Sequence, residues 1–109
     1  MLNNIFYYII PYHHGIQKTL LLNKGKWKKL YQEIDEILWN DWDPIGVNDI
    51  APRDEYQSYT PIIFSLKRKG VNEEEIAKEL YEIEKETIGL AGNLENCRIV
   101  ARKIIELNE

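Results

Sequence analysis

The stretch 26-KWKKLYQEIDEILWNDWDPIGV-47 decides the fold class, because it contains a complete amphipathic helix and the signal that ends it. Its apolar residues recur at intervals of three and four, which is the spacing of one face of an α-helix. Pro44 disfavours helical backbone at Asp43, so the pattern predicts a helix over residues 26–39 that ends by about residue 43. The apolar face is formed by Trp27, Leu30, Tyr31, Ile34, Ile37 and Leu38.

A second helix is predicted over residues 60–69. Thr60 is suited to the N-cap and Pro61 to the first helical position, since proline has the required backbone angle and needs no amide hydrogen there. Gly70 is suited to the C-terminal stop. Residues 47–55 are expected to form a loop, and a helical turn at 54–59 leads from it into this helix.

Two further helices follow. Asn72, with Glu75 three residues later, has the pattern of a capping box and predicts a helix that ends at Gly89. Asn93 predicts the cap of a last helix, whose apolar face includes Cys97, so that a buried, unreactive thiol is expected. Short loops join these segments, as in a helical bundle.

Residues 1–25 form a different segment, which is apolar at first and then basic. Ile5–Ile10 has high strand propensity, and 11–15 has the composition of a turn. Residues 16–22 either pair back as a second strand, which makes a short hairpin, or begin a helix. The sequence therefore predicts an all-α protein: a compact bundle of four to five helices in a domain at 26–109, with an N-terminal arm at 1–25.

Charge is segregated along the 109 residues, although the net charge is only −4. Residues 1–30 carry five lysines and no acid, whereas residues 31–60 carry eight acids and one arginine. An acidic segment repels phosphate and favours a basic protein partner, so no nucleic-acid partner is predicted. No run of 18 apolar residues is present, so no membrane partner is predicted, and a single cysteine fits the reducing cytoplasm.

No catalytic residue, metal site or cofactor site is predicted. The residues from Asp41 to Pro52 begin like a calcium-binding loop, but Ile45 and Pro52 replace oxygen ligands that such a loop requires. His13 and His14 are adjacent, so their side chains diverge on any regular element. Phosphate-binding loops and nucleophile motifs are also missing from the sequence.

The segment from Trp39 to Tyr59 is the candidate binding site, because aromatic residues are grouped there with carboxylates. Aromatic side chains are frequent anchors of protein interfaces. The alternative interpretation is that Trp42, Tyr56 and Tyr59 only fasten the loop to the bundle. The candidate partner-binding residues are Trp39, Trp42, Asp43, Asp49, Asp54, Glu55, Tyr56 and Tyr59.

Three cations of the last helix are expected to neutralise acids within the chain. Arg98 and Arg102 are four residues apart and share a helix face, and Lys103 follows directly. Their predicted partners are the glutamates of residues 73–86 or the acids of the loop. If they neutralised the loop acids, the loop would be scaffold and not a binding surface.

Over residues 30–107 the chain resembles a family of small uncharacterised bacterial proteins. The resemblance is carried by Trp42-Asp43-Pro44-Ile45-Gly46-Val47 and by Asp54-Glu55-Tyr56 with Tyr59, which fit the family motif W-D-P-[IF]-G-V…D-E-Y-x-x-Y. It implies an all-helical domain of unknown function. The family has no established catalytic residues, so the resemblance assigns none here.

The leading functional hypothesis is a non-enzymatic protein-binding domain, of the immunity type that neutralises a toxin. It would hold a basic protein partner on its acidic face and tryptophan loop. One alternative is a small-molecule binder or enzyme, with a pocket between this loop and the helix that follows Tyr56. Another is a self-associating structural module, in which the strand edge at Ile5–Ile10 joins two copies into a homodimer.

Overall fold

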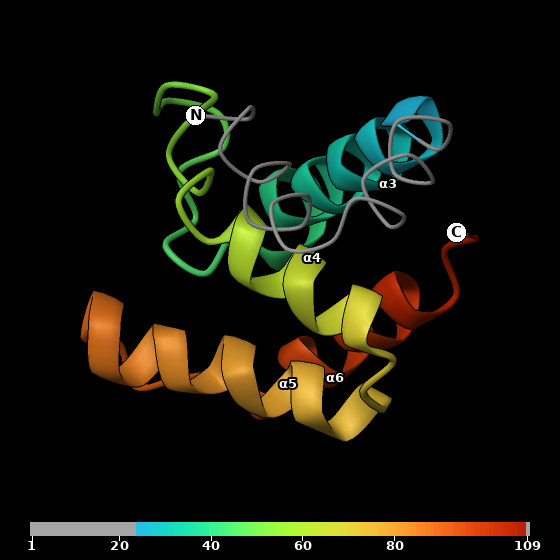
Figure 1. The fold of residues 1–109 in the computed structure, drawn as a ribbon. Helices are drawn as coiled ribbons and strands as arrows, with labels where there is room; N and C mark the ends of the chain where they lie inside the picture. Colours follow the sequence, from blue (N-terminus) through green and yellow to red (C-terminus); the bar gives the residue numbers. More distant parts are fainter. Residues whose placement is uncertain (1–23, 109) are drawn as a thin grey trace.

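The computed structural model describes residues 24–108, and every regular element in that range is helical (Figure 1). The predicted all-α fold class is thereby confirmed. Two of the four α-helices continue into π-helical segments, which have a wider turn. The elements are α3 (Lys24–Ile37) with η1 (Leu38–Trp42), α4 (Thr60–Lys69), α5 (Glu73–Glu82) with η2 (Ile83–Ile88), and α6 (Leu94–Ile105).

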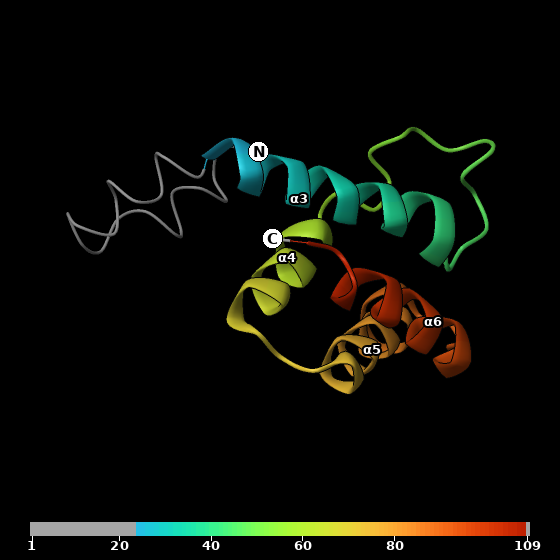
Figure 2. The ribbon, with the colours of Figure 1, turned by 90° about the vertical axis from the view of Figure 1, so that its right-hand side faces the viewer.

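Helices α3 and α4 pack side by side in opposite directions. The rings of Tyr31 and Phe64 make an edge contact with centroids 5.3 Å apart, and the guanidinium of Arg68 lies 4.2 Å from the Trp27 ring centroid. Figure 2 shows α3 running over α4 and α6, with α5 beyond them. The enclosed core takes apolar side chains from all four helices, including Leu30, Ile34, Ile63, Phe64, Ile76, Leu80, Val100 and Ile104.

The predicted start and stop residues lie at the helix ends. Asn72 Oδ1 accepts a hydrogen bond from the Glu75 amide at 2.9 Å, and Asn93 Oδ1 accepts one from the Asn96 amide at 3.0 Å. Gly70 and Gly89 follow their helices in the left-handed conformation, as C-terminal stops require. Local sequence signals therefore set these boundaries.

The prediction that Thr60 caps α4 is wrong. Thr60 is the first helical residue, and Tyr59 takes the cap position without a capping side-chain bond. The Thr60 hydroxyl instead donates to Asp35 Oδ1 of α3 at 2.9 Å. A partner on the neighbouring helix has displaced the local capping interaction.

The first helix is longer than predicted at both ends. It begins at Lys24 and passes through η1 to Trp42, so that it stops directly before Asp43 and Pro44. The hairpin and homodimer predictions for residues 1–23 lie outside the described residues. Between residues 24 and 108, no helix has the length and apolar character needed to cross a membrane.

Candidate functional site

The segment 43–55, here called the acidic loop, is fixed at its start by Asp43. This residue has an unusual positive φ of 29°, which turns the chain sharply after η1. Its carboxylate accepts hydrogen bonds from the amides of Val47 at 3.0 Å and Asn48 at 3.4 Å, and from the Tyr56 hydroxyl at 2.5 Å. One side chain thus closes the turn and ties it to the residues that precede α4.

Tyr56 supports the same turn from its buried side. Only 2% of this residue is exposed, and its ring lies 5.5 Å from the Trp42 ring and 6.0 Å from the Trp39 ring, centroid to centroid. Its hydroxyl also accepts a hydrogen bond from the Ile45 amide at 3.3 Å. Burial, and then the bond to Asp43, raises the pKa of Tyr56, so the hydroxyl keeps its proton and continues to donate.

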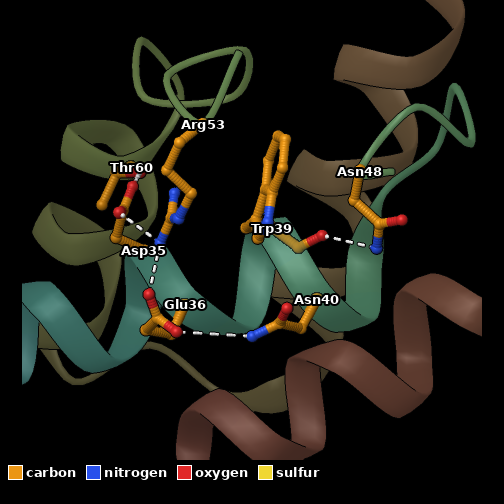
Figure 3. Close-up of polar contacts among 7 residues, drawn as sticks. All are labelled: Asp35, Glu36, Trp39, Asn40, Asn48, Arg53 and Thr60. Carbon is orange, nitrogen blue, oxygen red and sulfur yellow. Dashed lines mark hydrogen bonds and ion pairs between the residues drawn. The ribbon is translucent and has the colours of Figure 1, made fainter. Parts of the chain in front are cut away.

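Arg53 fixes the other end of the loop to α3 (Figure 3). Its guanidinium forms ion pairs with Asp35 at 3.0 Å and with Glu36 at 2.5 Å, and lies 5.2 Å from the Trp39 ring centroid. The Asn48 amide group adds a bond of 3.3 Å to the Trp39 carbonyl. The hydrogen bond from Arg53 lowers the pKa of Glu36, which favours the charged, paired form.

A buried carboxylate, Glu84, lies beneath η1. Its Oε2 accepts from the Trp42 indole at 2.7 Å and from the Cys97 thiol at 3.1 Å, while Oε1 accepts from the Asn93 amide at 2.7 Å. Only 2% of Glu84 is exposed. Burial, and then the bond to Glu84, raises the pKa of Cys97 to about 12, so this thiol is a proton donor and a poor nucleophile at neutral pH.

The candidate residues separate into supporting residues and exposed residues. Trp42 and Tyr56 are each 2% exposed, and Tyr59 packs edge-on against Trp42 with ring centroids 5.8 Å apart. Asp43 directs its carboxylate into the turn, and Trp39 is half-buried under Arg53. The exposed candidates are Asp49, Asp54 and Glu55, none of which forms an ion pair with any residue between 24 and 108.

The cations of α6 pair mainly with glutamates of α5. This is the first of the two predicted arrangements, in which the partners are glutamates of residues 73–86. Arg98 pairs with Glu74 at 3.2 Å, and Arg102 pairs with Glu73 at 3.3 Å. Lys103 pairs with Asp41 at 3.5 Å, which lies in η1 directly before the acidic loop. Asp49, Asp54 and Glu55 of the loop therefore have no cationic partner among residues 24–108.

Sequence reasoning missed three contributors to this site. Ile50, at 84% exposure, is the most exposed large apolar residue among those described, and it lies beside Asp49 at the tip of the loop. Arg53 was not recognised as an anchor, because its partners precede it by 17 and 18 residues. Glu84 continues the buried series of Ile76 and Leu80 at intervals of four, a signal that predicts burial on the same face.

A hollow of about 230 Å³ opens beside Glu84, between the end of η1 and the residues that precede α6. Pro44, Leu90 and Asn96 form part of its wall. The oxygens of Glu84 already accept hydrogen bonds, so this carboxylate is a structural acceptor more than a general base. Within residues 24–108, no group of three or more histidine, cysteine or acidic side chains is arranged to hold a metal ion.

The geometry supports a loop that is anchored at both ends and carries three exposed carboxylates without a cationic partner among residues 24–108, together with two exposed apolar residues, Ile45 and Ile50. Such a surface can bind by charge and contact. Comparison of the chain with protein-family models, with curated proteins and with solved structures gives no match in any of the three.

Proposed function

We propose that this protein is a non-enzymatic protein-binding domain, which holds a basic protein partner on the acidic loop, as a toxin-neutralising immunity protein would. The observation that carries the proposal is the contrast within the loop. Asp43 and Arg53 are committed to internal bonds, whereas Asp49, Asp54 and Glu55 are exposed and have no cationic partner among residues 24–108.

Anchoring at both ends supports this proposal on energetic grounds. Ordering a loop on binding costs free energy, and a loop that is already ordered avoids most of that cost. Here the Asp43 and Arg53 contacts hold the two ends, and Figure 2 shows the segment between α3 and α4 standing away from the packed helices near the C-terminal end of α3. Ile50 is held out at the tip, where it adds apolar contact area to a surface that is otherwise charged.

Charge then determines the kind of partner. The three free carboxylates repel phosphate and other acids, and they attract a surface rich in lysine and arginine. Each exposed ion pair contributes little by itself, about 0–1 kcal/mol. We therefore assign them mainly to fast association and partner choice, with the apolar contact at Ile50 slowing dissociation.

The family motif fits the same reading. Trp42 and Tyr56 are buried supports, Asp43 closes the turn, and Gly46 has the positive φ of 74° that a glycine adopts readily. These four motif residues thus shape the loop, whereas Asp54 and Glu55 of the same motif are among the exposed carboxylates. We accordingly propose membership of that bacterial family and a cytoplasmic setting, in which the free thiol of Cys97 stays reduced.

The test is affinity capture from an extract of the organism that encodes the protein. The variant D49N/D54N/E55Q removes the free charges of the loop, and E82Q/E86Q/E95Q removes three exposed charges elsewhere as a matched control. We expect one basic protein to be retained by the wild type and the control, and at least tenfold less by the loop variant. Equal retention by all three proteins would refute the proposal.

A small-molecule site is a second candidate, for which the hollow beside Glu84 is the observation. This hollow is not at the predicted place between the loop and the helix that follows Tyr56, where Tyr56 itself is buried. Its volume of about 230 Å³ is below the range of about 300–1,000 Å³ typical of ligand pockets, so only a small ligand would fit. A titration followed by NMR would place such a ligand at Leu90 and Asn96. Shifts confined to the acidic loop would instead favour the protein-binding function.

A further inference from the structure

Glu84 requires an explanation, because a carboxylate is a costly group to bury. Removing it from water is unfavourable by several kcal/mol unless donors replace the lost hydration. No cation among the described residues pairs with it, and three hydrogen-bond donors surround it instead. An apolar side chain would fill the same space more cheaply, so the carboxylate must hold something that an apolar residue cannot.

The strongest geometric clue is that Glu84 and its partner Trp42 both lie in π-helical segments. Such segments are rare and often occur at functional positions. In η1 the wider turn ends at Trp42, and the Asp43 amide donates to the Leu38 carbonyl at 3.0 Å. Directly after η2, the amides of Gly89 and Leu90 both donate to the Glu84 carbonyl, the second at 2.8 Å. The two segments are joined by the bond of 2.7 Å from the Trp42 indole to Glu84.

From Trp42 a continuous series of contacts leads to the acidic loop. The Trp42 ring packs on the Tyr56 ring, with centroids 5.5 Å apart. The Tyr56 hydroxyl donates to Asp43, whose carboxylate accepts from the amides of Val47 and Asn48. Asn48 is followed directly by Asp49 and Ile50, the exposed tip.

We infer that Glu84 is a positioning residue for the acidic loop: its carboxylate fixes the Trp42 indole, and Trp42 in turn fixes the turn at Asp43. The inference rests on the proposed function only in taking this loop as the docking surface. When the carboxylate is removed, the exposed residues of the loop stay the same, but they are held less firmly in place. Glu84 would thus control binding from a position that no partner touches.

Hydrogen exchange tests this inference without any partner. The amides of Val47 and Asn48 report on the turn, since both donate to Asp43. E84Q keeps the size of the side chain but directs an amide group toward three donors. Loss of one such bond predicts exchange about tenfold faster at both amides.

Two further variants separate positioning from general destabilisation. I104V trims the core at a buried site in the second half of α6 and should speed exchange at loop and core amides equally. W42F keeps a ring but removes the indole donor to Glu84. We expect W42F to speed exchange at Val47 and Asn48, and E84Q to add less than about twofold in the W42F background.

Two results would overturn the inference. One is that E84Q accelerates loop and core amides equally, as I104V is expected to do. The other is that E84Q keeps its full effect when W42F is already present. If E84Q does not fold, unchanged loop exchange in W42F alone also refutes the positioning role. Because these measurements involve no partner, their failure would leave the affinity-capture test of the proposed function unaffected.

Discussion

Two glycines in one short loop allow two costs of an added methyl group to be measured separately: the strain of a left-handed backbone and the clash with a neighbouring side chain. Gly89 and Gly92 have nearly the same positive φ, 87° and 89°. A Cβ added at Gly89 meets nothing within 4 Å, whereas one added at Gly92 would lie 2.5 Å from Cε1 of Tyr81. The same loop continues to Asn93, whose amide bonds to Glu84.

The expected losses follow from these contacts. Left-handed backbone costs an alanine about 1–2 kcal/mol, which is partly offset by about 0.4–1 kcal/mol because alanine restricts the unfolded chain. G89A should therefore lose about 1 kcal/mol. G92A should lose a further 1–3 kcal/mol, approximately the cost of overpacking, because the ring of Tyr81 must move. Against a total free energy of unfolding of about 5–15 kcal/mol, as is typical of natural proteins, the second loss is substantial.

Urea unfolding followed by tryptophan fluorescence measures both free energies. The double variant Y81A/G92A provides the control, because it removes the ring that the new methyl group meets most closely and leaves, of its three nearest atoms, only Cγ of Lys85, at 3.0 Å. Relative to Y81A alone, G92A should then cost no more than G89A costs in the wild type. Equal losses for the two single variants, or a full G92A effect without the Tyr81 ring, would show that steric contact is not the cause.

Three other predictions follow from individual contacts. Y56F removes the hydroxyl that joins the start of α4 to Asp43, and should lower the free energy of unfolding by about 1–2 kcal/mol in urea titrations. The pKa of the Cys97 thiol is raised from 9.0 to about 12, so this thiol should resist a disulfide reagent in the folded protein. Because the unfolded chain loses the thiol proton first, the free energy of unfolding should fall as pH rises from about 9 toward 12, and C97A should lessen that fall. Because the pKa of Glu36 is lowered in the folded protein, Glu36 contributes to the free energy of unfolding above pH 4.5, and this contribution is lost on acidification. R53M should therefore make the free energy of unfolding fall less steeply as the pH is lowered.

The helical layout was predictable because its determinants are local. Asn72 and Asn93 cap the helices they precede, Gly70 and Gly89 end helices, and the periodic apolar face of residues 26–39 lies in the core. Each of these signals acts within four or five residues along the chain. Thr60 failed as a cap because its best partner, Asp35, lies on another helix.

The internal bonds of the site were not predictable from local pattern. Trp42 and Glu84 are 42 residues apart, and Arg53 reaches back 17 residues to Glu36. Such pairings depend on how the helices pack, which composition and periodicity do not specify. The π-helical turns were missed for a related reason, since a spacing of three and four residues fits an α-helix equally well.

Internal pairing also changes what the charge of residues 31–60 means. Their eight acids and one arginine give −7, but three of the acids are paired, Asp35 and Glu36 by Arg53 and Asp41 by Lys103, and Asp43 faces its own turn. Three carboxylates of the loop, Asp49, Asp54 and Glu55, have no cationic partner among residues 24–108, and their attraction for a partner acts mainly within the screening length of about 8–10 Å. On the proposed function, close contact also contributes to recognition, through the exposed Ile50 and the anchored ends of the loop. Captured partner should accordingly be released only in part at high salt, and I50S should weaken the salt-resistant fraction more than any single acid variant does.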